Sequence, residues 1–359
     1  MLFQILKFKL ILVLGLYCQI SLAIPIDVAN KIQNKFDRNL YKMRPINQSH
    51  YAIRLYRITG KKDYLSPIVA YQFIESYQLE YLLKKRPYFL EKFNAKFIHL
   101  PLNYESFTKE EKRKLLLAKF PGITNALKML IILDHAHQVG ILSSHLYSKA
   151  PIALNYIRKN IPFLRYFLLD STVIKASSAQ VANFIYLLER LNLIDLRKEF
   201  IKRFQSLFPE TNDKTLSDKV FEDKIYGMTH IIFAASAYYQ HELSPQEFSW
   251  IYNYFVKNID RILSKTKPDV IAEVGLTFYL LHKATHSSAL SKIKIHLAKQ
   301  FDSEMQMISD RTGLDDLNQA EHRNVLTIML FKWPSTLHSG PNLENSEYLL
   351  SNLEAIHPL

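Results

Sequence analysis

Two kinds of helical pattern alternate along this chain, and this alternation limits the possible folds more than any other feature. One kind is apolar nearly all round, as in 270–281, and must be buried on most sides. The other kind, as in 246–264, has a single apolar face. The last five apolar helices are predicted to begin 46, 49, 44 and 48 residues apart, which suits a repeated two-helix hairpin. The six predicted openings lie near His50, Asp134, Gln180, Thr229, Glu273 and Glu321.

Strand signals are scarce, so the predicted fold class is all-α. Because one helix of each pair is apolar on nearly every side, we expect the hairpins to close into an (α/α)6 toroid with these helices inside. An open helical superhelix is one alternative. A ring of seven hairpins is another, since the first two apolar helices begin 84 residues apart. That extra length is either an insertion near residues 84–104 or a further hairpin.

The first residues are typical of a secretory signal peptide. Lys7 and Lys9 precede an apolar run, and small residues stand at positions 21 and 23. We expect a signal peptide at residues 1–23, an exported protein, and one helical-repeat domain at 24–359. The alternative is an uncleaved membrane-anchoring helix, although the run is short for a span. No later segment is long and apolar enough to predict a membrane helix.

The composition excludes several kinds of site. The only cysteine, Cys18, lies inside the predicted signal peptide, so the mature chain has no disulfide, thiolate metal site or cysteine nucleophile. His135 and His137 are two residues apart on a predicted helix and do not face each other. Zinc there would need a partner such as His230 or His322. We predict no metal and no cofactor.

The formal charge of +13 favours an anionic partner. For an exported chain with many aromatic residues, we expect an acidic glycan and not a nucleic acid. The alternative is that the charge reflects a lysine-rich composition and implies no partner.

Polar residues recur near the predicted openings of the apolar helices. Inner helices of a toroid run parallel, so these residues would face one rim, where the positive ends of the helix dipoles favour anions. Catalytic roles are predicted for Tyr226, His230, Glu273, Glu321 and His322. Substrate-binding roles are predicted for His50, Asp134, Gln180, Thr229, Arg323 and Asn324.

Each of these candidates also has a structural interpretation. Thr229 could cap its helix, with His230 an ordinary core histidine. Glu273 stands alone in an apolar helix; burial would raise its pKa and suit a general acid, or Arg323 could pair with it. The segment 321–324 covers a full helical turn, so about two of its residues would point inward and the others would cap the helix.

Three segments of the C-terminal half carry a resemblance to a known family. They are YGMTH at 226–230, DVIAEVG at 269–275 and AEHRN at 320–324. They resemble an uncharacterised bacterial family known as a domain of unknown function, which implies no activity. The helical repeat is also similar in architecture to the toroids of glycosidases, sugar epimerases and uronic-acid lyases. Lanthionine cyclases have a similar ring but use cysteine, which the mature chain lacks.

Two classes of function follow from these residues. The first is an enzyme acting on an acidic polysaccharide. A lyase would use His and Tyr for proton transfer with Arg or Asn on the uronate, whereas a hydrolase would use Glu273 and Glu321 as opposed carboxylates. The second is a non-enzymatic scaffold that binds a partner protein or a cell-envelope polymer. Convergence of the candidate residues in a deep pocket would favour the enzyme.

Overall fold

The computed structural model describes residues 25–84, 108–120, 122–284, 287–309 and 316–344. Almost all of this chain is helical. One two-stranded antiparallel hairpin joins β1 to β2, with Phe301 opposite Ile308. The α-helices after a first helix at 25–38 are α2 (Pro45–Thr59), α3 (Leu65–Lys84), α4 (Lys109–Lys119), α5 (Ile123–Gln138), α6 (Ala150–Lys159), α7 (Ile161–Leu168), α8 (Ser171–Arg190), α9 (Arg197–Leu207), α10 (Asp218–Ala235), α11 (Ser249–Lys257), α12 (Ile259–Lys265), α13 (Pro268–Leu280), α14 (Ser288–Lys299) and α15 (Leu317–Phe331). The short elements are η1 (Leu40–Lys42), η2 (Lys62–Tyr64), η4 (His145–Tyr147), η5 (Glu210–Thr215), β1 (Phe301–Asp302) and β2 (Met307–Ile308).

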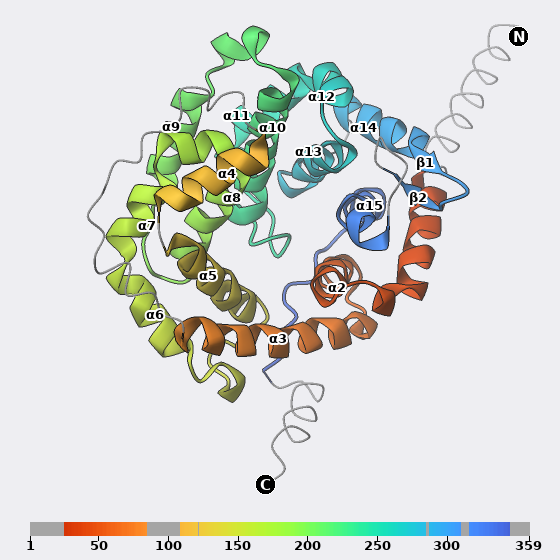
Figure 1. Ribbon diagram of the computed structural model, residues 1–359. Coiled ribbons are helices and arrows are strands. Elements are labelled where there is room, and N and C mark those ends of the chain that lie inside the picture. Colours follow the sequence, from red (N-terminus) through yellow and green to blue (C-terminus); the bar gives the residue numbers. More distant parts are fainter. Residues whose placement is uncertain (1–24, 85–107, 121, 285–286, 310–315, 345–359) are drawn as a thin grey trace, which may run out of the picture.

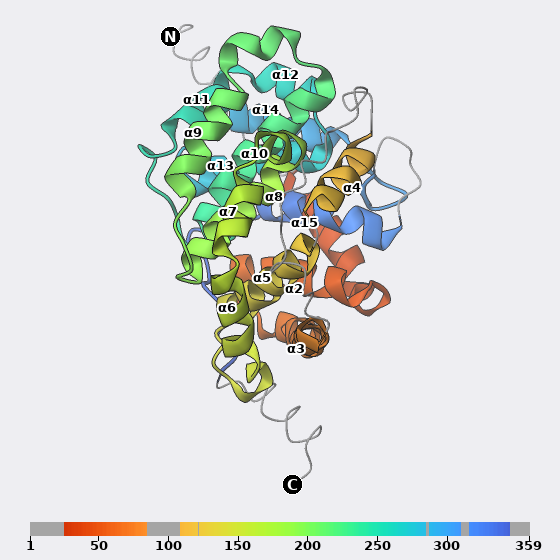
Figure 2. The same cartoon turned by 60° about the vertical axis from the view of Figure 1, so that its left-hand side comes forward.

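Six helices lie around a common centre, with the others outside them (Figure 1). Neighbouring contacts lead from α2 to α15, α13, α10, α8 and α5, and α3 then joins α5 back to α2. The helices α6, α7 and α9 follow one another along the outside (Figures 1 and 2). The all-α prediction is confirmed. Closure into six regular hairpins stays a prediction, because the outer helix α3 completes this path of contacts.

The burial pattern explains why these helices are inside. Nine consecutive residues of α13, Val270 to Phe278, are buried, and so is Leu280. By contrast, α9 buries only Phe200 and Phe204 and exposes most of its other face. An all-apolar helix gains most from contacts on every side, whereas a helix with one apolar stripe is stable at the surface.

The predicted openings of three inner helices are wrong, although the period is right. The helices α5, α8, α10, α13 and α15 begin at residues 123, 171, 218, 268 and 317, which are 48, 47, 50 and 49 apart. Asp134, Gln180 and Thr229 therefore lie well inside their helices. Thr229 does not cap α10, because Ser217 does so by accepting from the Val220 amide. The segment 226–230 is likewise in the body of α10.

The extra length between the first two inner helices contains α4, which packs on α8. Residues 85–107, where an insertion was expected, lie outside the described ranges. The predicted signal peptide at 1–23 does too. In the ranges that are described, no helix is long and apolar enough to cross a membrane.

The first and last helices of the described chain pack together. Lys332, just after α15, donates to Gln33 Oε1 at 2.7 Å. Asp37 accepts from Tyr51 of α2 at 2.8 Å. The helix at 25–38 thus covers the outside of α2 and α15 (Figure 1).

Gly227 sets the close approach of α10 to α8. A Cβ at this position would lie 2.6 Å from Ser178 Oγ and 2.7 Å from Phe204 Cε2. We expect Gly227→Val to lower the free energy of unfolding by about 1–3 kcal/mol through overpacking, measured by chemical denaturation. The control is Gln205→Val on the exposed face of α9. Equal stability of the two variants would contradict this packing role.

Candidate functional site

A cavity of about 410 Å³ lies at the centre of the inner helices. Side chains from α2, α3, α5, α8, α10 and α15 line it, together with Tyr238 from the turn after α10. The six candidates from the sequence that line it are His50, Asp134, Gln180, Tyr226, His230 and His322. These polar residues from distant parts of the chain therefore converge in one pocket.

The charged groups on the cavity wall are predominantly basic. Arg54, Arg57 and Arg190 line it, and Asp134 is the one carboxylate among the described lining residues. Asp134 is 4% exposed and already bound to Arg190 through both oxygens, at 2.7 and 3.1 Å. Gln138 donates to the same carboxylate at 2.6 Å. The wall thus has more positive than negative charge for a ligand to meet.

Arg57 joins the wall to the C-terminal segment 338–343. Its Nε donates to the Gly340 carbonyl at 3.1 Å, and its Nη1 donates to the Tyr238 carbonyl at 2.6 Å. The His338 amide donates to the Arg57 carbonyl at 2.9 Å, and the Leu343 amide to the Val139 carbonyl at 2.9 Å. The segment therefore crosses the C-terminal ends of α2 and α5.

Backbone of unusual conformation places Tyr238 in the cavity. Ala237, Tyr238 and Tyr239 have φ values of 50°, 56° and 70°, a left-handed turn that residues other than glycine rarely adopt. The Tyr238 amide donates to the Phe233 carbonyl at 2.7 Å, and the Tyr239 amide to Ser236 Oγ at 3.1 Å. These bonds hold the turn, which follows directly on the end of α10 at Ala235.

His230 is held in one orientation beside Tyr226. Its Nδ1 lies 2.9 Å from Asn183 Oδ1, so Nδ1–H donates to the amide oxygen, and in the neutral ring the lone pair is then on Nε2. That buried Nε2 has no hydrogen-bond partner in the described structure and lies 3.6 Å from Glu273 Oε1. The Tyr226 ring packs edge-on against the imidazole, with centroids 4.4 Å apart. Burial, and then the charge of Glu273, raise the pKa of Tyr226, so its hydroxyl keeps its proton.

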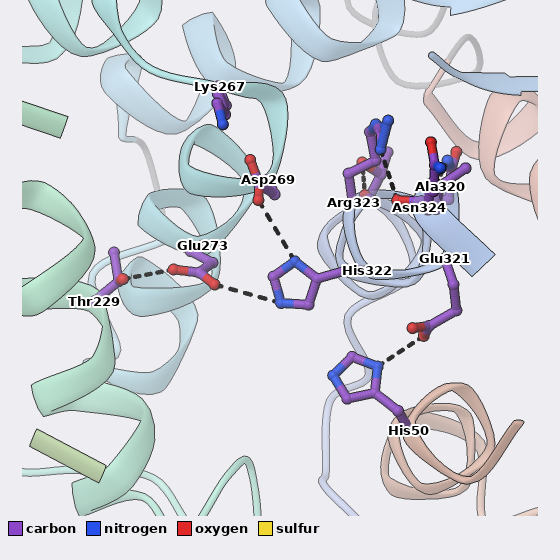
Figure 3. Close-up of polar contacts among 12 residues, drawn as sticks. His50, Thr229, Lys267, Asp269, Glu273, Ala320, Glu321, His322, Arg323 and Asn324 are labelled. Atoms are coloured by element: carbon purple, nitrogen blue, oxygen red, sulfur yellow. Dashed lines mark hydrogen bonds and ion pairs between the residues drawn. The ribbon is translucent and has the colours of Figure 1, made fainter. Parts of the chain in front are cut away.

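Glu273 stands behind the histidines instead of on the wall. It is 1% exposed and accepts from Thr229 Oγ1 at 2.6 Å. Its Oε1 lies 3.7 Å from Nε2 of His322, whose Nδ1 lies 3.6 Å from Asp269 (Figure 3). Burial alone would lower the pKa of His322, but Asp269 and Glu273 outweigh it and raise that pKa. Glu273 therefore lies beside His230 and His322 and not beside Arg323, which was one of the alternatives for its partner.

Two further carboxylates are placed in the same way. Glu321 lies 2.8 Å from Nδ1 of His50, and Glu75 lies 2.7 Å from Nδ1 of His135 (Figure 3 shows the first pair). Both carboxylates are at most 2% exposed. Burial, followed by the charge of Arg54, lowers the pKa of His50 to about 4, so this imidazole is neutral at neutral pH. A carboxylate behind each histidine fixes which ring nitrogen faces the cavity.

The structure does not bring the last two candidates to the site. Asn324 is fully buried and bonds the Ile308 backbone in both directions, at 2.8 and 2.9 Å. Arg323 donates to the Gln319 carbonyl at 2.9 Å and does not line the cavity. Both lie on the part of α15 turned away from His50 (Figure 3). The structure separates these two side chains from the other candidates because a full helical turn cannot face one side.

Sequence reasoning missed several residues of the wall. Arg54 and Arg57 follow His50 at the spacing of one helical face, a signal that the sequence did contain. Asn183 lies one turn beyond Gln180 on α8 in the same way. No local sequence pattern predicts that Tyr238 lines the cavity, because its position depends on the left-handed turn. Within the described ranges, no three His, Cys, Asp or Glu side chains are grouped to bind a metal.

The chain belongs to the family described as Domain of unknown function (DUF3541), whose model matches residues 25–356. The resemblance seen in three C-terminal segments thus extends over nearly the whole chain. No curated protein and no solved structure matches it.

Breaking the central ion pair should destabilise the fold. Arg190→Met leaves the Asp134 carboxylate buried without its cation, which we expect to cost about 3–5 kcal/mol in the free energy of unfolding. The measurement is chemical denaturation. Arg190→Met combined with Asp134→Leu should recover part of the loss, because no charge is then left unpaired. A double variant less stable than Arg190→Met would contradict this account.

The raised pKa of His322 gives stability a specific pH dependence. Its imidazolium stabilises the fold fully below the ordinary pKa of about 6.5, and this contribution is lost as the pH rises through the higher folded-state pKa. Wild-type protein should therefore lose more stability across this interval than His322→Gln, measured as the free energy of unfolding against pH. His282→Gln, at a half-exposed pair with Glu242, is the control. Identical slopes for wild type and His322→Gln would refute the ion pairs with Asp269 and Glu273.

Proposed function

We propose that this DUF3541 protein is an exported enzyme that cleaves an acidic polysaccharide by β-elimination in the central cavity. The observation that carries the proposal is the pairing of His230 and Tyr226 in a pocket whose wall bears three arginines and one carboxylate. A uronate sugar has the matching chemistry: a carboxylate, and beside it a carbon-bound hydrogen at C5 that a base can remove.

His230 is suited to be the base. Asn183 fixes the tautomer with the lone pair on Nε2, and burial keeps water away from that atom. When Nε2 takes the C5 proton, the ring becomes an imidazolium 3.6 Å from Glu273 Oε1. The carboxylate then stabilises the charge that forms in the step.

Tyr226 is suited to be the acid. Its raised pKa keeps the hydroxyl protonated, and its ring contacts that of His230. As the C5–H electrons form the C4=C5 double bond, the C4–O glycosidic bond breaks and Tyr226 gives its proton to the departing oxygen. The proton on His230 returns to Tyr226 after the products leave, so neither water nor an oxidant is consumed.

A hydrolase agrees less well with this cavity. Its two carboxylates would have to face the sugar from opposite sides. Glu273 and Glu321 are each 1% exposed, are bound to Thr229 and His50 respectively, and do not line the cavity. Asp134 does line it, but Arg190 and Gln138 already occupy its oxygens.

A non-enzymatic scaffold is the second candidate class, and one observation weighs against it. Its binding residues would be expected to spread over a shallow rim. Here six of the candidate residues line one interior pocket, and His230 and Tyr226 are themselves largely buried. Such enclosure is typical of a site for one small ligand or one sugar of a chain.

The test is an assay of purified protein on alginate, polygalacturonate and a glucuronate-containing glycosaminoglycan. We expect ultraviolet absorbance from the unsaturated uronate product on at least one of them. His230→Gln and Tyr226→Phe should each lower the rate about 10²–10⁴-fold, the usual worth of a general base or acid. His282→Gln and Tyr41→Phe, at exposed positions, are matched controls and should keep the wild-type rate.

Other products would overturn the β-elimination. New reducing ends without the absorbance would indicate hydrolysis, and inversion at C5 without chain cleavage would indicate an epimerase. Binding without any turnover would favour the scaffold.

A further inference from the structure

The three arginines of the cavity wall differ in how their nitrogens are used. Each of the three guanidinium nitrogens of Arg57 donates to an oxygen, from Gly340, Tyr238 and Gln138. Those of Arg190 donate to both oxygens of Asp134 and to the Ala234 carbonyl. Every guanidinium nitrogen of these two arginines therefore already donates to another part of the protein.

Arg54 is different. It is 8% exposed and lines the cavity, and its Nη1 donates to the His50 carbonyl at 3.1 Å. Its Nε is buried and has no hydrogen-bond partner among the described residues. Arg54 forms no ion pair with a described carboxylate, although its charge acts on Glu321: burial raises the pKa of that carboxyl, and His50 and then Arg54 lower it. A buried guanidinium without an anion is costly, so the position is hard to explain by stability alone.

The surroundings of Arg54 place this cation beside the proposed reaction centre. Burial dominates the lowered pKa of His50, and the charge of Arg54 is its next cause. The same charge opposes the rise in the pKa of Tyr226, which burial causes. It also opposes the rise in the pKa of His322, where burial lowers the pKa but Asp269 and Glu273 outweigh it. On another side the guanidinium carbon lies 6.0 Å from the centre of the Tyr239 ring. Arg54 therefore acts on Tyr226 as well as on two histidines of the wall.

We propose that Arg54 is the site that binds the carboxylate of the ligand, so that the ligand is a sugar acid recognised by its ionised carboxyl group. That the ligand is a sugar rests on the proposed function. That the ligand carries a carboxylate rests on Arg54 alone. A guanidinium donates to a carboxylate through two parallel N–H groups, and the unpartnered Nε supplies one of them.

A second unpartnered atom supports a sugar acid over an isolated anion. Of the buried atoms that lack a partner, two belong to residues on the cavity wall, Arg54 Nε and His230 Nε2. One is a cationic donor, and the other carries a lone pair. A sugar acid presents its carboxylate to Arg54 and the acidic C–H beside that carboxylate to His230. A simple anion lacks the C–H group, and a neutral sugar lacks the carboxylate.

The experiment is calorimetric binding of trisaccharides of galacturonate, mannuronate and guluronate, and of their methyl esters. Arg54→Gln should weaken binding of the free acid about 10–100-fold, as expected for a lost charge-assisted hydrogen-bonded pair. It should leave binding of the ester nearly unchanged. Arg54→Lys keeps the charge but not the planar fork and should fall between the two. Arg165→Gln, at a half-exposed pair with Glu199, is the charge-matched control.

The assignment would be refuted if wild-type protein bound none of the free acids, or bound acid and ester equally well. It would also be refuted if Arg54→Gln bound the free acid with wild-type affinity. A sulfated neutral trisaccharide that binds as tightly as the acid would also refute recognition of a carboxylate.

His230→Gln separates this assignment from the proposed reaction. It should fail to turn the polymer over but still bind the free acid more tightly than its methyl ester, whereas Arg54→Gln should lose that preference, so recognition of the carboxylate and catalysis can fail independently. The melting temperature of ligand-free protein gives a second readout. Arg54→Gln should melt near wild type because it breaks only one bond to the His50 carbonyl, whereas Arg190→Gln should melt well below it. An Arg54→Gln protein that melts as early as Arg190→Gln would make Arg54 a structural residue.

Discussion

Charges buried among apolar helices are costly unless they are paired or hydrogen-bonded, and the centre of this fold depends on that constraint. The Arg190–Asp134 pair ties α8 to α5, and Arg57 ties α2 to the turn after α10 and to the segment 338–343. Polar side chains that would otherwise oppose burial thus become the contacts between inner helices. The same polar side chains form part of the cavity wall, beside apolar residues of the inner helices.

Each histidine of the cavity wall is held by a polar side chain that contacts one of its ring nitrogens. His50, His135 and His322 each have a carboxylate behind them, and His230 has Asn183 on one side and Glu273 near the other. Buried acceptors of this kind fix ring orientation and proton position before any ligand arrives. The carboxylates therefore act through the imidazoles, which is why Glu273 and Glu321 belong to the site without lining it.

The sequence contained the repeat but not the helix boundaries. Apolar residues on all sides identify the inner helices because tertiary packing demands them. The first half of α10 is polar and reads as a loop, yet Lys224 there is fully buried, bonded to Asp213 at 2.6 Å. Asp213 lies outside α10, so the pattern of apolar residues in that helix does not predict that Lys224 is buried. Six of the eleven candidate residues line the cavity. Arg323 and Asn324 were predicted as sequence neighbours of His322, but neighbours on a helix point in different directions.

The packing of the helix at 25–38 against α2 and α15 has a consequence for how the molecule folds. Contacts such as Lys332 to Gln33 join residues 299 positions apart, and such long-range contacts form late because of the entropy of closing the loop. The intervening hairpins are local and can form in order as the chain is made. Of the helices that line the cavity, α15 is the last in the chain, and it adds His322 to the wall beside His50. The two histidines therefore come together only when the end of the chain packs against its beginning.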